Sequence, residues 1–270
     1  MNARRKAAPR DTIVVERDGA IGWIRINRPE RLNAFADDMR ERLEAGLSAH
    51  EENPEVRCVI LTGEGRAFST GGDVSVMSDL LKAKDVERFE ELVRAGMRIV
   101  ALMDAMGTPV IAAVNGPAAG AGACLALASD MRVASENASI GFTFLRVGLH
   151  PDWGGSYFLP RLVGPALAAE LLLTGGMISA ERGERLGLFN QVVPAEELEN
   201  AARALAGQIA AGPPEVVRAV KRTLRDGMST SLAEVLDMEL AAQLAAFDSS
   251  DGREGIRAFL EKRTPRFSGS

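Results

Sequence analysis

Asp152 is the side chain with the clearest chemical potential, because it stands between Pro151 and Trp153 at a predicted turn. Apolar neighbours would exclude water and raise the pKa of its carboxyl group toward the range in which it can both take and return a proton. The same position, just before Gly154-Gly155, also suits an aspartate that caps a helix or forms an Asx turn. Asp152 is therefore either a proton carrier or a structural cap.

Two glycine-rich segments could hold a negatively charged oxygen. They span residues 67–73 (AFSTGGD) and 115–130 (NGPAAGAGACLALASD), and each directly follows a predicted buried strand. Glycine lets the backbone approach a ligand closely, and N–H groups at the start of a helix carry positive partial charge. The pattern fits an anion-holding pair of loops, and it fits two tight connections between packed elements equally well.

Residue counts and motifs exclude several other kinds of site. Two histidines and two cysteines without CxxC spacing argue against a zinc site and against a disulfide framework. Residues 120–125 lack the third glycine of a dinucleotide motif, and the chain has neither a Gly-Lys dipeptide nor a Gly-x-Ser-x-Gly elbow. The formal charge of −5 disfavours nucleic acid as a partner.

Apolar periodicity predicts the elements that position these loops. Strands at 13–15 and 21–27 form a hairpin around Asp18-Gly19, and helices are predicted at 37–50 and 85–106, with buried strands at 56–61 and 109–114. This order predicts an α/β fold with a parallel sheet under helices. We place a flexible tail at 1–10, a core at 11–193 and, after Pro194, a helical region at 194–270.

The uncharged stretch 105–129 has about the length of a membrane span. Its repeated Gly, Pro and Asn residues would break a lipid-facing helix, so we expect no membrane span. The basic start at 1–10 has no apolar stretch behind it and does not resemble a secretory signal. Together with the cysteine usage, this favours a cytoplasmic protein.

Four segments in order resemble the crotonase superfamily, also called the enoyl-CoA hydratase/isomerase family. They are NRPERLNA at 27–34, the two glycine-rich segments, and GLHPDWGGSYFLPRLVG at 148–164, and the match runs nearly end to end. The resemblance implies a spiral of ββα units with a C-terminal helical trimerisation region, assembled as a homotrimer or hexamer. It also implies acyl-CoA substrates, with no metal and no cofactor beyond the CoA of the substrate.

In this family two backbone N–H groups hold the thioester oxygen, and by motif position they fall on Gly72 and Ala121. Arg28 and Arg31 are candidate contacts to the CoA phosphates, although an exposed arginine is more often a solvated surface charge. The residues expected to line the substrate are Ala67, Thr70, Asp73, Gly120 and Trp153.

Typical hydratases of the family carry a glutamate at each of two positions that here hold Cys124 and Phe144. Asp152 instead resembles the single aspartate of the isomerase branch. The resemblance therefore implies a 2,3-enoyl-CoA isomerase in which Asp152 removes and returns one proton. Two alternatives stay open: hydration by a single carboxylate with a backbone-held water, and a non-catalytic acyl-CoA-binding trimer.

Overall fold

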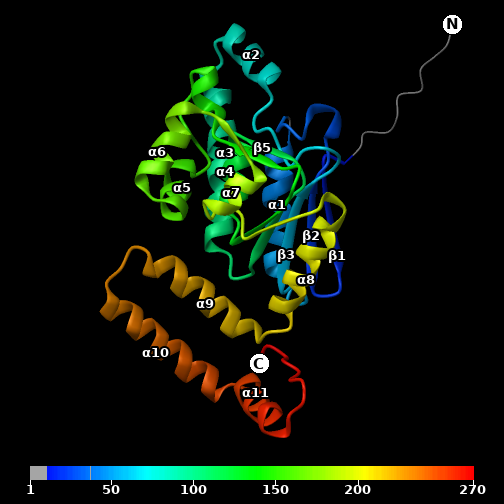
Figure 1. The fold of residues 1–270 in the computed structure, drawn as a ribbon, viewed down its shortest axis with the longest axis vertical. Helices are drawn as coiled ribbons and strands as arrows, with labels where there is room; N and C mark the ends of the chain where they lie inside the picture. Colours follow the sequence, from blue (N-terminus) through cyan, green and yellow to red (C-terminus); the bar gives the residue numbers. More distant parts are fainter. Residues whose placement is uncertain (1–10, 37) are drawn as a thin grey trace, which may run out of the picture.

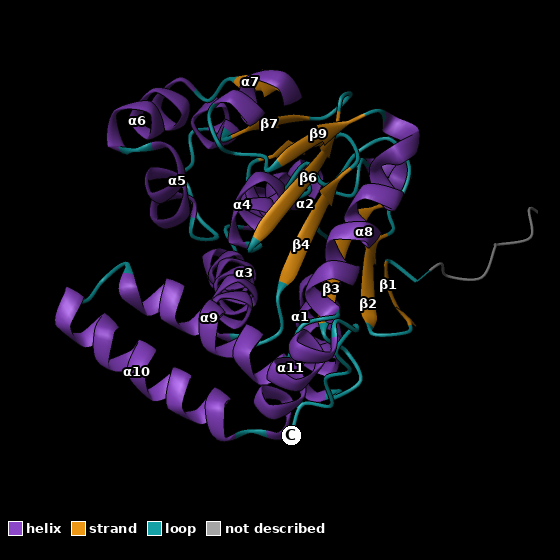
Figure 2. Ribbon diagram, turned by 60° about the horizontal axis from the view of Figure 1, so that its bottom comes forward, coloured by secondary structure: helices purple, strands orange, loops and turns teal. Residues whose placement is uncertain are grey.

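A twisted six-stranded sheet forms the centre of the computed structural model, which describes residues 11–36 and 38–270. The expected tail at 1–10 and Asp37 lie outside the described residues. The strand order is β1-β2-β3-β4-β6-β9, with β1 and β2 antiparallel and the following pairs parallel (Figure 2). The strands are β1 (Ile13–Asp18), β2 (Ile21–Ile26), β3 (Cys58–Gly63), β4 (Val110–Val114), β6 (Met131–Ser135) and β9 (Gln191–Val193).

The two faces of this sheet carry different helices. Val59 and Leu61 of β3 point into a large apolar core with α1 (Met39–Glu52), α3 (Val86–Ala105) and α4 (Ala121–Ala128). Cys58 and Ile60 point to the opposite face, where they pack with α8 (Leu198–Ala210). This alternation follows from the two-residue period of a strand, and it buries β3 completely.

A second, smaller sheet lies beside the first and has the order β5-β7-β8. Its strands are β5 (Pro117–Ala119), β7 (Ser139–Gly141) and β8 (Met177–Ser179). Ser69 forms an isolated bridge to Ala118 of β5, which brings the first glycine-rich segment alongside the second. Strands of three residues are too short to show a period, so this sheet was not predicted from the sequence.

The remaining helices surround the ends of the two sheets. Helix α2 (Val74–Ala83) projects at the top of Figure 1, and α5 (Gly155–Val163), α6 (Pro165–Thr174) and α7 (Ala180–Arg185) form a group at one side. Three short 3₁₀ turns, η1 (Pro29–Arg31), η2 (Thr143–Val147) and η3 (Ala195–Glu197), complete the connections.

Three C-terminal helices, α9 (Pro214–Gly227), α10 (Leu232–Asp248) and α11 (Ser250–Glu261), extend away from the sheets (Figures 1 and 2). Neither α9 nor α10 has a buried residue. Helix α8 differs, because it packs on the central sheet. The helical stretch predicted after Pro194 thus contains one helix of the core followed by an extended helical arm.

Most of the predicted elements are confirmed. The hairpin turns at Asp18-Gly19, and Asp85 caps α3 by accepting a hydrogen bond from the Arg88 N–H. The strand predicted from residue 56 begins at Cys58, because the Val56 N–H donates to Asn53 O in a turn. The uncharged stretch 105–129 forms β4, β5 and α4, and no described helix is long and apolar enough to cross a membrane.

Candidate active site

The two glycine-rich segments run side by side. The Ala119 N–H donates to Ser69 O at 2.9 Å, and the Phe68 N–H donates to Pro117 O at 3.1 Å. Gly71 adopts φ +84°, and a Cβ added to it would lie 3.0 Å from the Ala121 nitrogen. Glycine is therefore needed here both for the backbone conformation and for the close approach of the two loops.

The backbone N–H groups of Gly72, in the first glycine-rich loop, and of Ala121, at the start of α4, are both available to a ligand. Gly72 pairs with Phe35 in a parallel bridge, in which the Phe35 N–H donates to Gly71 O and Phe35 O accepts from the Asp73 N–H. The Gly72 N–H consequently points away from Phe35. Ala121 is the first residue of α4, so its N–H has no acceptor within the helix and carries part of the positive helix dipole.

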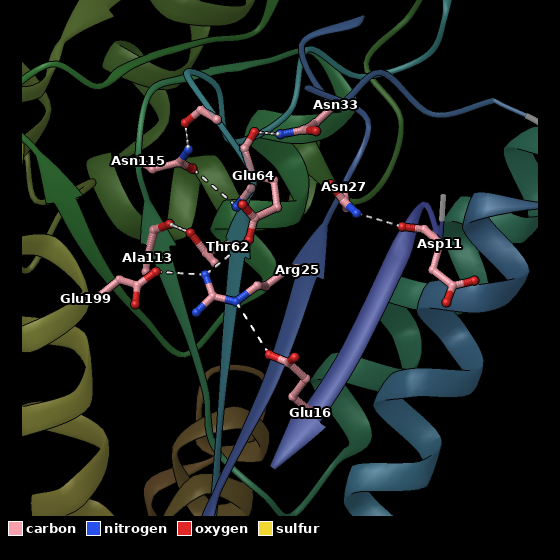
Figure 3. Close-up of polar contacts among 12 residues, drawn as sticks. Asp11, Glu16, Arg25, Asn27, Asn33, Thr62, Glu64, Ala113, Asn115 and Glu199 are labelled. Carbon is pink, nitrogen blue, oxygen red and sulfur yellow. Dashed lines mark hydrogen bonds and ion pairs between the residues drawn. The ribbon is translucent and has the colours of Figure 1, made fainter. Parts of the chain in front are cut away.

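Two asparagines hold the start of the first loop in place (Figure 3). The Asn33 amide donates to Ala67 O at 2.7 Å and to Glu64 O at 3.0 Å, and the Asn115 amide donates to Gly65 O at 2.9 Å. Asn33 is fully buried and has φ +58°. Analysis of the sequence did not single out these side chains, although asparagine at a tight turn was an available signal.

Asp152 lies in the loop between η2 and α5, and its Oδ1 is buried without a hydrogen-bond partner among the described residues. Burial raises the pKa of Asp152 to about 6, against the opposing effects of Arg40, the residue's own N–H and His150. Gly154, not Asp152, is the N-cap residue of α5. The structural-cap interpretation is therefore wrong, because this side chain caps nothing.

Trp153 packs the Asp152 loop against the core. Its ring is 2% exposed and lies 5.0 Å from the ring of Phe35, measured between centroids. Trp153 has φ +48°, and a Cβ added to Gly96 of α3 would lie 1.9 Å from its indole nitrogen. A left-handed conformation at a tryptophan is unusual, so the surrounding packing must hold it.

Cys124 and Phe144 lie close to the candidate site. A Cβ added to Gly155 would lie 2.7 Å from the Cys124 Sγ, so the start of α5 packs directly on α4. Burial, with a further contribution from the Asp152 charge, raises the pKa of the Cys124 thiol well above its ordinary value. Phe144 is buried and lies close to Gly120. Neither side chain can serve as a carboxylate base.

The other predicted binding residues divide into two groups. Asp73 caps α2 by accepting from the Ser75 N–H, and it pairs with Arg28 at 2.6 Å. Burial alone would raise the pKa of Asp73, but the Ser75 and Arg28 hydrogen bonds outweigh it and lower the pKa to about 2. Arg31, in contrast, is exposed. The structure places Ala67, Thr70 and Gly120 in the two loops described above.

Arg40 is a residue of this region that sequence reasoning missed. It lies on α1, is 5% exposed, and its guanidinium carbon stands 5.7 Å from the Phe35 ring centroid. In the sequence it lies three residues before Leu43 and seven before Leu47, on the apolar side of the predicted helix, but an arginine at such a position is usually exposed. The tertiary structure shows that its side chain is buried.

Comparisons with known proteins agree with the resemblance seen in the sequence. The Enoyl-CoA hydratase/isomerase family profile matches residues 16–270. The chain belongs to this family, which is the crotonase superfamily. It is an enzyme, so the non-catalytic alternative is set aside.

Two relatives and one solved structure illustrate the range of the family. The chain is 37% identical to a crotonyl-CoA hydratase of Syntrophomonas wolfei, over 95% of this chain and 98% of the relative. It is 39% identical to a 1,2-epoxyphenylacetyl-CoA isomerase of Escherichia coli, over 90% of this chain and 93% of the relative. An enoyl-CoA hydratase from Bacillus anthracis has the same fold, with a TM-score of 0.92 and 35% identity over 96% of this chain and 100% of that one.

The packing of the Trp153 indole against Gly96 can be tested by the substitution Gly96→Ala. The new methyl group would collide with the indole, so we expect a loss of about 1–3 kcal/mol in the free energy of unfolding. Urea unfolding followed by tryptophan fluorescence measures it. Gly207→Ala in α8 is the matched control, because an added Cβ there meets nothing within 4 Å and should not destabilise the fold. Equal stability of Gly96→Ala and the unmodified protein would contradict the packing described.

Proposed function

We propose that the enzyme is a 2,3-enoyl-CoA isomerase, which shifts an acyl double bond between the C3–C4 and C2–C3 positions of a CoA thioester. The observation that carries this proposal is Asp152, a desolvated carboxyl group with a free oxygen. The two positions at which typical hydratases carry glutamates hold Cys124 and Phe144. A single carboxylate is sufficient for isomerisation, because one base can take a proton from one carbon and return it to another.

The first step places the thioester oxygen between the N–H groups of Gly72 and Ala121. Removal of a proton from C2 develops negative charge on this oxygen, and preorganised donors stabilise the charge as it forms. A single donor of this kind typically contributes about 3–4 kcal/mol to the transition state. The close approach of the two loops, where a Cβ added to Gly71 would lie 3.0 Å from the Ala121 nitrogen, supports the pairing of the two amides at one site.

Asp152 then acts as the proton carrier. Its carboxylate takes the proton from C2, the electron pair spreads over the thioester as an enolate conjugated with the double bond, and the acid returns the proton at C4. The double bond consequently moves to C2–C3. A carboxyl group whose pKa lies near 6 suits both halves of this exchange near neutral pH.

Hydration of a 2-enoyl-CoA is the alternative, and the relative named crotonyl-CoA hydratase supports it. In this case Asp152 alone would activate a water molecule held by backbone groups. The relative named 1,2-epoxyphenylacetyl-CoA isomerase supports isomerase chemistry instead. The reaction in either form uses no cofactor beyond the CoA of the substrate. Of the two arginines considered for its phosphates, Arg31 is the better candidate, because Asp73 engages Arg28.

We further propose that the helical arm assembles the chain as a homotrimer or hexamer. Leucines at helical spacing along α10 are largely exposed in the single chain: Leu236 by 53%, Leu240 by 59% and Leu244 by 60%. An apolar stripe of this kind is typical of a surface that another chain covers. The two buried, free cysteines support a cytoplasmic location.

The isomerase proposal predicts activity that depends on Asp152. With a 3-enoyl-CoA substrate we expect a gain of conjugated-thioester absorbance, reduced by a factor on the order of 10² to 10⁴ in Asp152→Asn. Asp18→Asn, at an exposed end of β1, is the charge-matched control and should retain activity. Loss of absorbance from a 2-enoyl-CoA, with a 3-hydroxyacyl product found by mass, would establish the hydratase alternative instead.

Activity should also depend on pH in a direction fixed by Asp152. The base works as a carboxylate, so kcat/KM should fall as the pH drops through about 6 and the group becomes protonated. Stopped-time assays across this range, at constant ionic strength, measure the effect. A flat profile through pH 6 would contradict the assignment of Asp152 as the base.

The assembly proposal predicts that Leu240→Glu breaks the oligomer. A carboxylate in the middle of an apolar contact would be desolvated without a partner, which disfavours association. Sedimentation velocity of the purified protein should show a monomer for this variant. Leu173→Glu on α6, where the leucine is 70% exposed, is the control and should leave the trimer intact. A monomeric unmodified protein would refute the proposal.

A further inference from the structure

Arg40 is a buried cation that has no role in the reaction proposed above. The residue is only 5% exposed, and its Nε has no hydrogen-bond partner among the described residues. The guanidinium forms no ion pair with a described carboxylate. Arginine stays protonated in proteins, so the interior here holds a positive charge without a close counter-charge. Such an arrangement is expensive unless a nearby group compensates for it.

Arg40 lies near the loop that carries Gly72 and near the aromatic pair of Phe35 and Trp153. Its Nη2 lies 3.7 Å from the position that a Cβ on Gly72 would occupy. Its guanidinium also lies beside the Phe35 ring, and Trp153, the residue after Asp152, packs against the same ring. Asp152 in turn has a buried oxygen without a partner among the described residues. Phe35 and Trp153 therefore connect the loop that carries one unpartnered group to the helix that carries the other, which has the opposite charge.

Few other charged or titratable groups act on this pair. From α1, Glu41 acts on Arg40, and from α3, Arg88 acts on it in the opposite sense. The Asp152 charge acts on the Cys124 thiol of α4, and His150 of its own loop acts on Asp152. Among the side chains that favour the carboxylate form of Asp152, Arg40 has the largest effect.

We propose that Arg40 is a positioning residue that keeps Asp152 ionised enough to act as a base. Desolvation alone favours the neutral acid, and a fully protonated Asp152 could not accept a proton from the substrate. The Arg40 charge offsets part of this effect from inside the protein, where water cannot screen it. This inference rests on the proposed function for its catalytic meaning, but the electrostatic coupling itself can be measured without turnover.

The direct test is the titration of Asp152 in the full-length protein labelled with ¹³C at the aspartate carboxyl carbons. The Asp152 signal is assigned by its absence in Asp152→Asn. Replacing Arg40 by methionine removes the charge at similar volume, so the titration midpoint of Asp152 should move upward by about one pH unit. Arg40→Lys keeps the charge and should leave the midpoint close to that of the unmodified protein.

Two further variants complete the test. Arg94→Met removes an exposed arginine that pairs with Glu90 on α3, and it should not move the Asp152 midpoint. Arg40→Gln offers a second neutral replacement if the methionine variant does not fold. An unchanged midpoint in a folded neutral variant would overturn the proposal, and so would an equal upward shift in Arg40→Lys.

Kinetics separates this inference from the proposed function. If the isomerase proposal holds, the acid limb of kcat/KM should shift to higher pH in Arg40→Met by the same amount as the carbon titration, while the alkaline plateau recovers. If Arg40 had only a structural role, Arg40→Met would lower kcat/KM at every pH without shifting the pH at which kcat/KM falls. Absence of isomerase turnover in the unmodified enzyme would refute the proposed function, whereas the titration would still decide whether Arg40 acts on Asp152.

Discussion

Exclusion of water from the Asp152 carboxyl group is the constraint on which the site depends. A carboxylate in water is a weak base with a pKa near 4, whereas desolvation raises the pKa of this one to about 6. The loop that carries this carboxyl group is held by Trp153 in its left-handed conformation, by the space that Gly96 leaves for the indole on α3, and by the packing of α5 on α4. A change in any of these contacts would admit water and lower the affinity of the base for protons.

Phe35 connects this carboxyl group to the candidate oxyanion site. Its backbone holds Gly71 and Asp73 on either side of Gly72, and its ring contacts both Trp153 and the guanidinium of Arg40. In the proposed reaction the Gly72 and Ala121 N–H groups bind the thioester oxygen while Asp152 acts at C2, so the relative position of these groups must be held closely. One rigid aromatic residue that contacts both loops is a simple way to hold it.

The sequence was sufficient to predict four strands of the central sheet, the helices α1 and α3, and the loops that carry Gly72, Ala121 and Asp152, because long apolar runs and glycine-rich turns leave strong local signals; the five-residue strand β6 was missed. It could not predict the three-residue strands, which lack enough residues to show a period. It also missed Asn33 and Arg40, whose importance depends on burial. Burial is a property of the tertiary structure: Arg40 has the spacing of the apolar side of α1, but arginine is mostly an exposed residue, so the sequence alone did not indicate that it is buried.

In the proposed reaction one desolvated carboxyl group carries a proton between two carbons of the substrate. The decisive experiment is a single turnover, in ordinary water, of a 3-enoyl-CoA deuterated at C2. If Asp152 takes and returns the same proton, shielded from solvent, the 2-enoyl product should carry deuterium at C4, as measured by mass spectrometry of the acyl fragment. Product whose C4 hydrogen comes entirely from solvent, or a 3-hydroxyacyl product, would contradict the account.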